Sequence, residues 1–380
     1  MRYLISGGGT GGHIFPAVSI ANALRELDPE CEILFVGALG RMEMERVPQA
    51  GYHIIGLPVR GFDRSHPWKN IRVLIDLIRS MRQARDIVRD FRPDVGIGVG
   101  GYASGAAMKV AAKMGIPILL QEQNGFAGVT NKLLKDDAQK ICVAYEGMER
   151  FFPKEKLILT GNPVRQNLTS GTREEAIGYF NKEFKMQFSA ERRTLLIIGG
   201  SLGARTVNNS ICKHLKELAD SGIQVVWQTG KYYFAECQKT LQSVLGDDKE
   251  AMGRICCTDF LSQMPLAYAL ADLVVSRAGA SSISELCLLG KAAILVPSPN
   301  VAEDHQTHNA MALVKHDAAV MVRDADAEQK LVAETIGLIH NDKRLETLHT
   351  NILKMALPDS ARIIAQEAMQ LAEKNSKKQG

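Results

Sequence analysis

Short apolar runs alternate with longer stretches of helical period along most of the chain. The runs lie at residues 33–36, 95–99, 116–120, 141–143, 195–198, 225–228, 273–276 and 293–297. Their length and their content of Val, Ile and Leu are typical of buried strands. Strands that alternate with helices form mostly parallel sheets with helices packed against them. The pattern therefore predicts an α/β fold.

Two apolar runs lead into glycine-rich turns, and each turn is followed by a helical pattern. Residues 7–13 read GGGTGGH after the run at 3–5, and residues 199–205 read GGSLGAR after the run at 195–198. Backbone N–H groups at such a turn bind phosphate at the start of the next helix. The recurrence predicts two nucleotide-binding-type domains, with a boundary after the Gly- and Pro-containing stretch 161–165.

The composition supports two domains and argues against several classes of protein. A chain of 380 residues with 46% hydrophobic residues can form two cores without disulfides or metals. Its formal charge of +4 is too small for a dedicated nucleic-acid binder. The seven cysteines contain no CxxC pair and are expected to be reduced core residues of a cytosolic protein. The N-terminus lacks a signal peptide and no apolar run reaches about 18 residues, so any membrane contact is expected to be peripheral.

Polar residues at strand ends in the first half of the chain are candidates for a site. His13 follows the first glycine turn, where the positive end of a helix favours a neutral, proton-accepting imidazole. A histidine that only caps or packs beneath the turn is the alternative. Glu122 and Asn124 follow the run at 116–120, at the edge where open α/β sheets bind ligands. Ordinary Asn-Gly turn chemistry is the alternative for this pair.

The second half carries a denser set of candidates. Residues 276–285 read SRAGASSISE, so that Ser281 and Ser282 could donate to a phosphate and Glu285 could accept from a ribose diol. A serine N-cap with an exposed acid explains either residue but not the preceding R-x-G. The polar residues 303–309 follow the run at 293–297 and indicate recognition of sugar hydroxyls.

Two patterns imitate metal sites. His305 and His308 lie near Asp304 but lack a third convincing ligand. Residues 324–326 read DAD, like the manganese-binding DxD of some sugar transferases, but they precede a predicted helix and are better interpreted as helix capping. We therefore expect neither a metal nor a cofactor.

The segment 68–92 combines apolar and basic residues at helical spacing. Its arginines outnumber its aspartates and Trp68 flanks it, which is consistent with docking on anionic lipid headgroups. A helix that packs on a sheet with its basic face in solvent explains the same pattern. The sequence leaves both interpretations open.

A set of motifs in this chain closely resembles those of the MurG family of bacterial peptidoglycan glycosyltransferases. The motifs are GGGTGGH, GGYAS, QEQNGFAG with TNK, GNPVR, GGSLGAR, RAGASSISE and DHQTHNA, in the family's order from residue 7 to residue 309. The resemblance implies a GT-B fold, in which two Rossmann-like domains with mostly parallel sheets face each other across a deep cleft. It implies an N-terminal acceptor and membrane-facing domain of residues 1–165, joined by a C-terminal helix at 358–380. Residues 166–357 would form a UDP-GlcNAc-binding domain.

The same resemblance implies the roles of individual residues. Those that would bind the donor are Phe260 and Leu261 at the uracil, Glu285 at the ribose, Ala280, Ser281 and Ser282 at the diphosphate, and Gln306 and Asn309 at the sugar. Those that would meet the nucleotide-sugar phosphates from other segments are Arg165 and Ser201. Those on the face where the acceptor diphosphate and the sugar meet are Thr10, Gly11, Gly12, His13 and Asn124. The Pro-bearing segment 297–302 departs from the family pattern.

The implied reaction transfers N-acetylglucosamine from UDP-GlcNAc to the 4-hydroxyl of MurNAc in a lipid-linked MurNAc-pentapeptide. UDP carries an α-linked sugar and the family's product is β-linked, so a single displacement inverts the anomeric carbon. His13 is the first candidate for the base, and Glu122 is the alternative. Helix N-termini and Arg165 would stabilise the leaving UDP without a divalent ion. The expected location is the cytoplasmic face of an anionic membrane, and binding of other cell-wall synthesis proteins stays open.

An NAD-dependent oxidoreductase is the main competing hypothesis from a different class, because residues 7–12 also fit G-x-G-x-x-G. Its fingerprint needs an acid at the end of the second strand, about 20 residues after the glycines. The run at 33–36 ends at Gly37 and Ala38 without such an acid. A sugar-nucleotide epimerase of the same fold and a non-catalytic membrane scaffold also compete with the transferase hypothesis.

Overall fold

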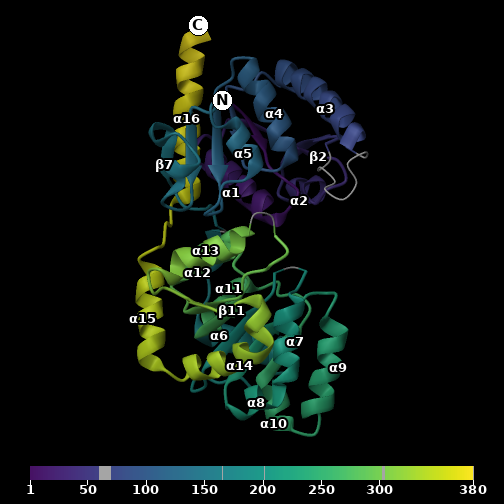
Figure 1. Ribbon diagram of the computed structural model, residues 1–380, viewed down its shortest axis with the longest axis vertical. Coiled ribbons are helices and arrows are strands. Elements are labelled where there is room, and N and C mark those ends of the chain that lie inside the picture. The colour runs from purple at the N-terminus through teal and green to yellow at the C-terminus, as the bar shows by residue number, and fades with distance from the viewer. Residues whose placement is uncertain (60–69, 165, 201, 302–303, 380) are drawn as a thin grey trace. The chain divides into compact units, whose positions relative to one another are not determined.

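The computed structural model of the chain describes residues 1–59, 70–164, 166–200, 202–301 and 304–379 (Figure 1). It divides into two compact units. Unit 1 consists of Met1–Arg165 and Leu357–Gly380, and unit 2 consists of Gln166–Ala356. Each unit is built on one sheet, and the described strand ladders are parallel throughout. The predicted α/β class with parallel sheets is therefore confirmed.

Unit 1 contains a seven-stranded sheet in the order β3-β2-β1-β4-β5-β6-β7. The strands are β1 (Arg2–Ser6), β2 (Glu32–Ala38), β3 (His53–Leu57), β4 (Val95–Gly98), β5 (Ile118–Glu122), β6 (Lys140–Val143) and β7 (Leu157–Leu159). The direction of winding reverses between β1 and β4, which pair through Ile5 and Ile97. In open α/β sheets, ligands bind beside this switch point at the carboxyl ends of the strands.

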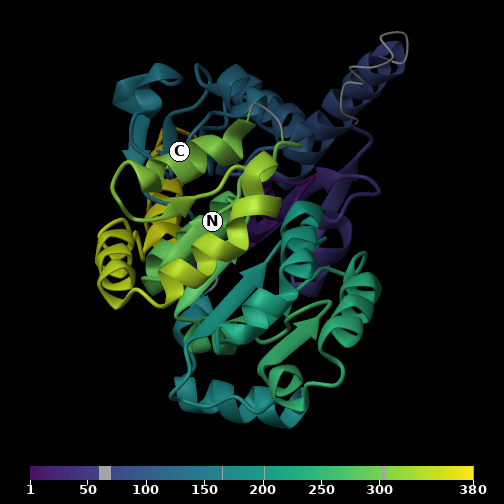
Figure 2. The ribbon, with the colours of Figure 1, turned by 60° about the horizontal axis from the view of Figure 1, so that its bottom comes forward.

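Helices cover both faces of this sheet because alternate residues of each strand enter different hydrophobic clusters. Leu4 and Val36 pack with α3 (Asn70–Phe91), α4 (Tyr102–Lys113) and α5 (Val129–Leu134). Tyr3 and Phe35 pack instead with α1 (Gly11–Leu27) and the last helix, α16 (Ser360–Gln379). The short helix α2 (Glu43–Gln49) follows β2. Figure 1 shows α16 (yellow) lying along unit 1, and Figure 2 shows α3 extending from its edge.

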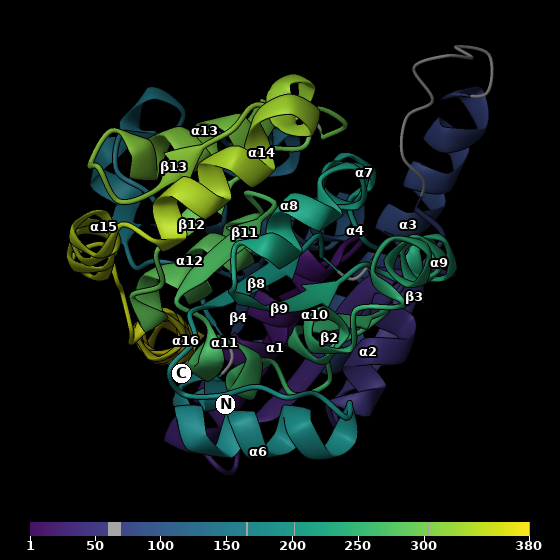
Figure 3. The same cartoon turned by 90° about the horizontal axis from the view of Figure 1, so that it is seen from below.

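Unit 2 contains a six-stranded sheet in the order β10-β9-β8-β11-β12-β13, with its switch point between β8 and β11. The strands are β8 (Thr194–Ile198), β9 (Gln224–Gln228), β10 (Ile255–Thr258), β11 (Leu273–Ser276), β12 (Ala293–Leu295) and β13 (Val320–Met321). The helices are α6 (Arg173–Glu183), α7 (Arg205–Lys213), α8 (Leu215–Asp220), α9 (Phe234–Leu245), α10 (Lys249–Arg254), α11 (Met264–Leu270), α12 (Ala280–Leu289), α13 (His305–Val314), α14 (Asp324–Ile339) and α15 (Asp342–Leu353). In Figure 3 the central strands lie between α7, α8 and α14 on one side and α6 and α11 on the other.

The cysteines lie within these cores or at their edges and carry free thiols. Burial raises the pKa of the Cys142, Cys256 and Cys287 thiols to about 12. A thiol with so high a pKa stays protonated at neutral pH and is a poor nucleophile. These residues therefore act as small apolar side chains.

The packing of α16 on α1 generates a prediction for stability. Ile364 is fully buried in the cluster that α16 shares with α1, whereas the neighbouring Ile363 is 37% exposed. Ile364→Ala should lower the free energy of unfolding of unit 1 by about 2–5 kcal/mol, measured by urea denaturation. Ile363→Ala is the matched control and should change it far less. Equal effects of the two substitutions would contradict this placement of α16.

Candidate functional site

The two glycine turns of unit 1 pack against each other beside the switch point. Gly8 N donates to the carbonyl oxygen of Gly100 at 3.3 Å. A Cβ on Gly101 would lie 2.5 Å from the Gly8 carbonyl oxygen, and Gly9 and Gly101 have φ of 88° and 90°. Only glycine adopts this left-handed backbone without strain and leaves room for such an approach. The contact brings the turn after β1 onto the turn after β4.

The imidazole of His13 lies against these turns and is partly exposed. Its Nδ1 is 3.0 Å from the carbonyl oxygen of Gly8 and 3.3 Å from Thr10 Oγ1. A carbonyl oxygen can only accept, so the contact assigns the proton to Nδ1. In the neutral ring, Nε2 is then the proton-accepting nitrogen. A Cβ on Gly100 would lie 2.9 Å from Nε2, so glycine there makes room for the ring.

The start of α1 presents backbone donors. The N–H groups of His13 and Ile14 donate to the carbonyl oxygen of Thr10. Among the described residues, no acceptor meets the N–H groups of Thr10, Gly11 and Gly12. Three such donors at the positive end of a 17-residue helix form a site suited to an anion.

Glu122 is a buried carboxylate that organises the turn after β5. Its Oε1 accepts from Asn124 N at 3.1 Å and Asn124 Nδ2 at 3.4 Å. Its Oε2 accepts from Gly128 N at 2.9 Å and Asn131 Nδ2 at 3.0 Å. With 2% exposure and four donors, the carboxylate fixes the turn that carries Asn124.

Buried amides join the QEQN motif to the GNPVR motif. Gln123 Nε2 donates to the carbonyl oxygen of Val99 at 2.9 Å, and Gln121 Nε2 donates to Asn162 Oδ1 at 3.0 Å. Asn162 Nδ2 in turn donates to the carbonyl oxygen of Gln123 at 2.9 Å. These bonds tie the ends of β4 and β5 to the segment after β7. Arg165, the last residue of GNPVR, lies outside the described residues.

In unit 2, Gln228 links the second glycine turn to the turn that holds Phe260 and Leu261. Its Nε2 donates to the carbonyl oxygen of Gly200 at 3.1 Å, and its Oε1 accepts from Leu261 N at 3.0 Å. Phe260 is 57% exposed, whereas Leu261 is buried. Phe260 therefore offers an accessible aromatic ring at the end of β10. Ser201 lies outside the described residues.

Arg277, the arginine of the RAGASS motif, has a structural role. Its guanidinium pairs with Asp324 and donates to the carbonyl oxygens of Val296 at 3.0 Å and Pro297 at 3.3 Å. Asp324 also accepts from Thr206 Oγ1 at 2.9 Å. The arginine thus connects the ends of β11 and β12 to the start of α14.

This ion pair corrects the interpretation of residues 324–326 as a helix cap. The helix α14 begins at Asp324 itself, its N-cap is Arg323, and no side chain caps it. Asp324 faces Arg277, and Asp326 pairs with Arg323 at 2.8 Å and Lys330 at 3.9 Å. In the part of the chain that the structure describes, no group of three or more His, Cys, Asp or Glu side chains could hold a metal ion.

The predicted donor-binding residues at α12 differ in how they are held. Tyr268 OH donates to Glu285 Oε2 at 2.9 Å, and both side chains are buried. The N–H groups of Ala280, Ser281 and Ser282 begin α12 without a side-chain cap, and no acceptor meets them among the described residues. The Oγ of Ser281 is buried and lacks a hydrogen-bond partner there. The start of α12 is therefore a second backbone site suited to an anion.

Gln306 and Asn309 both lie on α13, but they have different surroundings. Ser298 N donates to Gln306 Oε1 at 2.9 Å, which leaves the amide NH₂ as the group that can donate to a ligand. The segment that departs from the family pattern thus orients Gln306. Asn309 is fully buried and donates to the carbonyl oxygen of Ala278 at 3.2 Å. Asn309 therefore holds the RAGASS turn.

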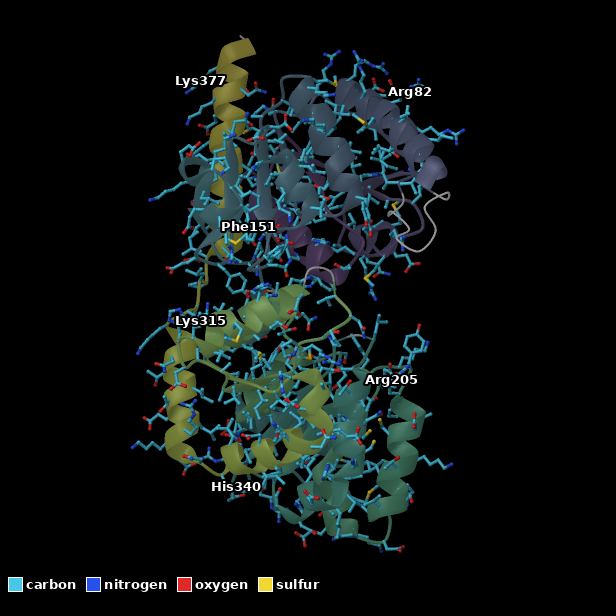
Figure 4. All side chains as sticks on the ribbon, in the orientation of Figure 1. Arg82, Phe151, Arg205, Lys315, His340 and Lys377 are labelled. Carbon is cyan, nitrogen blue, oxygen red and sulfur yellow. The ribbon has the colours of Figure 1, made fainter. Side chains whose placement is uncertain are left out.

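The outer side of α3 combines apolar and basic residues. Ile75 and Ile78 are each 46% exposed, and Arg79, Arg82 and Arg85 are exposed. Figure 4 shows Arg82 at the outer surface of unit 1. Trp68 and Lys69 lie outside the described residues, as do the side chains of 70–72 and 74. Where the chain is described, no helix is long and apolar enough to cross a membrane.

Sequence reasoning did not identify several side chains that hold the site. Among them are Gln228, which joins two turns, Tyr268, which orients Glu285, and Arg277 in its pairing with Asp324. Gln228 is the polar last residue of an apolar strand, and that position is a signal that could have identified it. Tyr268 lies within α11, and nothing in the local sequence indicates its distant partner.

The chain matches a family of sugar transferases in sequence. Residues 3–143 match the glycosyltransferase family 28 N-terminal domain, and residues 194–375 match the glycosyltransferase family 28 C-terminal domain. A protein of Bacteroides thetaiotaomicron is 57% identical over 374 residues and covers 98% of each chain. It is named "UDP-N-acetylglucosamine--N-acetylmuramyl-(pentapeptide) pyrophosphoryl-undecaprenol N-acetylglucosamine transferase".

Solved structures share the fold. The crystal structure of Acinetobacter baumannii MurG matches with a TM-score of 0.76 at 24% identity, covering 97% of this chain and 99% of that one. A UDP-GlcNAc 2-epimerase from Neisseria meningitidis matches with a TM-score of 0.66 at 16% identity, covering 97% of this chain and 100% of that one. At these identities the likeness speaks for the fold alone, and it confirms the predicted pair of Rossmann-like domains.

The Arg277–Asp324 pair generates a prediction. Both side chains are largely buried, at 13% and 19% exposure. Asp324→Ala should lower the free energy of unfolding of unit 2 by about 3–5 kcal/mol, because it leaves a buried guanidinium unpaired. The matched control is Asp326→Ala, which removes a carboxylate paired with exposed Arg323 and Lys330 and should change stability little. Urea denaturation measures both, and equal stability of the two variants would contradict the structural role.

Proposed function

Because this chain belongs to the MurG family of glycosyltransferase family 28, we propose that it transfers N-acetylglucosamine from UDP-GlcNAc to undecaprenyl-pyrophosphoryl-MurNAc-pentapeptide. The accepting group is the 4-hydroxyl of MurNAc. The observation that carries the proposal is the presence of one backbone anion site in each unit, at the starts of α1 and α12. Donor and acceptor each contain a diphosphate, so two such sites match the two substrates.

Unit 2 is the proposed donor-binding unit. The exposed ring of Phe260 stacks on uracil, and Glu285, oriented by Tyr268, accepts from the ribose diol. The start of α12 binds the diphosphate. The amide NH₂ of Gln306, fixed through Ser298 N, donates to a sugar hydroxyl. Ser201 and Arg165 stay predicted phosphate contacts.

Unit 1 is the proposed acceptor-binding unit. The N–H groups of Thr10, Gly11 and Gly12 bind the lipid-linked diphosphate, next to His13. The acceptor hydroxyl attacks the anomeric carbon, the bond from that carbon to UDP breaks, and His13 Nε2 takes the hydroxyl proton. Glu122 supports this chemistry by fixing the turn at Asn124 rather than by accepting the proton.

The lipid acceptor requires contact with a membrane, for which we propose α3. Exposed Ile75 and Ile78 enter the interface, and Arg79, Arg82 and Arg85 meet anionic headgroups. The protein is then peripheral at the cytoplasmic face, where UDP-GlcNAc is available.

One assay tests the reaction. The protein is incubated with radiolabelled UDP-GlcNAc and the lipid-linked MurNAc acceptor, and label is followed into the lipid. Transfer of label supports the proposal. Conversion of UDP-GlcNAc to an isomeric nucleotide sugar without acceptor would instead identify an epimerase.

His13→Ala should lower kcat by about 10²- to 10⁴-fold, because a well-placed general base contributes that much. UDP affinity, measured by calorimetry, should change little because His13 is not among the proposed nucleotide contacts, which lie in unit 2 apart from Arg165. His53→Ala, on an exposed position of β3, is the control. If His13→Ala turns over substrate at a rate near that of the wild type, the imidazole has a structural role only. Glu122 would then be the candidate base.

Glu285→Ala should raise KM for UDP-GlcNAc about tenfold or more, because a charged hydrogen bond is worth about 1.5–3 kcal/mol. Tyr268→Phe keeps the carboxylate but removes its orienting bond, so KM should rise less, in the same direction. Tyr179→Phe in α6 is the control. A fall in kcat at unchanged KM for Glu285→Ala would argue against a ribose contact.

Replacing Arg79 and Arg82 by Glu should reduce sedimentation with phosphatidylglycerol vesicles, since each basic residue near an anionic surface contributes about 1 kcal/mol. Reaction on membrane-embedded acceptor should slow, and reaction on a short-chain soluble acceptor should persist. The control replaces Lys239 and Lys249, exposed residues of unit 2, by Glu to match the change in charge. If both double variants sediment like the wild type, the membrane contact lies elsewhere.

A further inference from the structure

Glu43 is a buried carboxylate beneath the first glycine turn, and the proposed mechanism leaves it without a task. It is the first residue of α2 and its side chain is fully buried. A carboxylate is rarely buried unless donors compensate for its loss of water. Its surroundings therefore indicate what it does.

Two backbone N–H groups meet this carboxylate. Gly9 N donates to Oε2 at 3.0 Å, and Ala38 N donates to Oε1 at 3.0 Å. Gly9 belongs to the turn after β1, and Ala38 ends the neighbouring strand β2. Hydrogen bonds to an ionised acceptor are roughly twice as strong as neutral ones. Glu43 therefore clamps the glycine turn to the end of β2.

Two glycines make room for this clamp. A Cβ on Gly8 would lie 2.1 Å from Glu43 Oε1, and a Cβ on Gly37 would lie 2.7 Å from Glu43 Cγ. The missing side chain of Gly8 therefore makes room for the carboxylate of Glu43, rather than for the phosphate of a ligand. The Gly9 N–H is committed to the same carboxylate.

We propose that Glu43 is a positioning residue for the acceptor diphosphate, an inference that rests on the proposed function. By holding Gly9 N and placing a negative charge under the turn, Glu43 restricts the diphosphate to the N–H groups of Thr10, Gly11 and Gly12. Those groups begin the helix that carries His13. The carboxylate therefore sets the register between the acceptor's diphosphate and the base.

The same geometry argues against the hypothesis that this chain binds a dinucleotide. In a dinucleotide-binding fold, an acid at the end of the second strand accepts hydrogen bonds from the ribose. Here the acid that follows β2 is buried, and each of its oxygens accepts from a backbone N–H. Glu43 thus serves the turn itself and presents no carboxylate to a ribose.

Glu43→Gln tests the proposal, with Glu45→Gln as the matched control on the exposed side of the same helix. A carboxamide offers one oxygen to two N–H donors, so one of the two bonds is lost. With a short-chain lipid-linked MurNAc-pentapeptide as acceptor, KM for the acceptor should rise about tenfold, as loss of one charged hydrogen bond implies. KM for UDP-GlcNAc and UDP affinity should stay near wild type. The melting temperature should fall, because one buried N–H is left unsatisfied. Glu45→Gln should match the wild type throughout.

Two results would overturn the proposal: an unchanged acceptor KM in folded Glu43→Gln, or equal rises in KM for donor and acceptor. If the variant does not fold, single-residue amide hydrogen exchange on the wild type decides. The Gly9 amide should be protected without ligand, and the amides of residues 10–12 should become protected only with the acceptor. A rapidly exchanging Gly9 amide overturns the clamp. Absence of sugar transfer by the wild type would instead refute the proposed function.

Discussion

Close contact between the backbones of neighbouring turns is the constraint on which the candidate anion site at the start of α1 depends, and a contact of the same kind recurs at the second glycine turn in unit 2. A Cβ on Gly101 would lie 2.5 Å from the Gly8 carbonyl oxygen, and a Cβ on Gly203 would lie 2.1 Å from the carbonyl oxygen of Thr229. Contacts this short exclude every side chain, so only glycine permits them. In unit 1 the turn held in this way leads into α1, whose first N–H groups meet no acceptor among the described residues.

Buried polar side chains hold these turns in place. Gln228 and Glu43 each hydrogen-bond to the backbone of two segments that are distant from each other in the sequence. Glu122 hydrogen-bonds to the backbone of the turn that follows it. A fully paired buried network is rigid, because breaking one bond leaves a polar group unsatisfied in a medium of low dielectric constant. The two candidate anion sites are consequently made largely of main chain, and the side chains beneath the turns determine their shape.

The apolar runs predicted the central strands because parallel strands buried on both faces need continuous hydrophobic sequence. The edge strands β7 and β13 are only three and two residues long and carry too weak a pattern to be recognised. His13 and Glu285 could be singled out because the glycine and serine motifs beside them are local. The partners of Asp324 and Glu43 could not, since Arg277 lies 47 residues before Asp324 and Gly9 lies 34 residues before Glu43. A D-x-D before a helix looks the same whether it caps the helix or pairs with a distant arginine.

The return of the chain to unit 1 has a consequence for the order of folding during synthesis. Ala365 and Ala368 of α16 belong to the same cluster as Tyr3 and Ile20, near the start of the chain. Unit 2 is continuous in sequence, from residue 166 to residue 356, and can complete its core as soon as it emerges from the ribosome. Unit 1, although translated first, must wait with one face of its sheet partly uncovered until residues 360–379 arrive. The half of the protein made first is therefore the half finished last, and in that interval its exposed apolar face is a natural client for a chaperone.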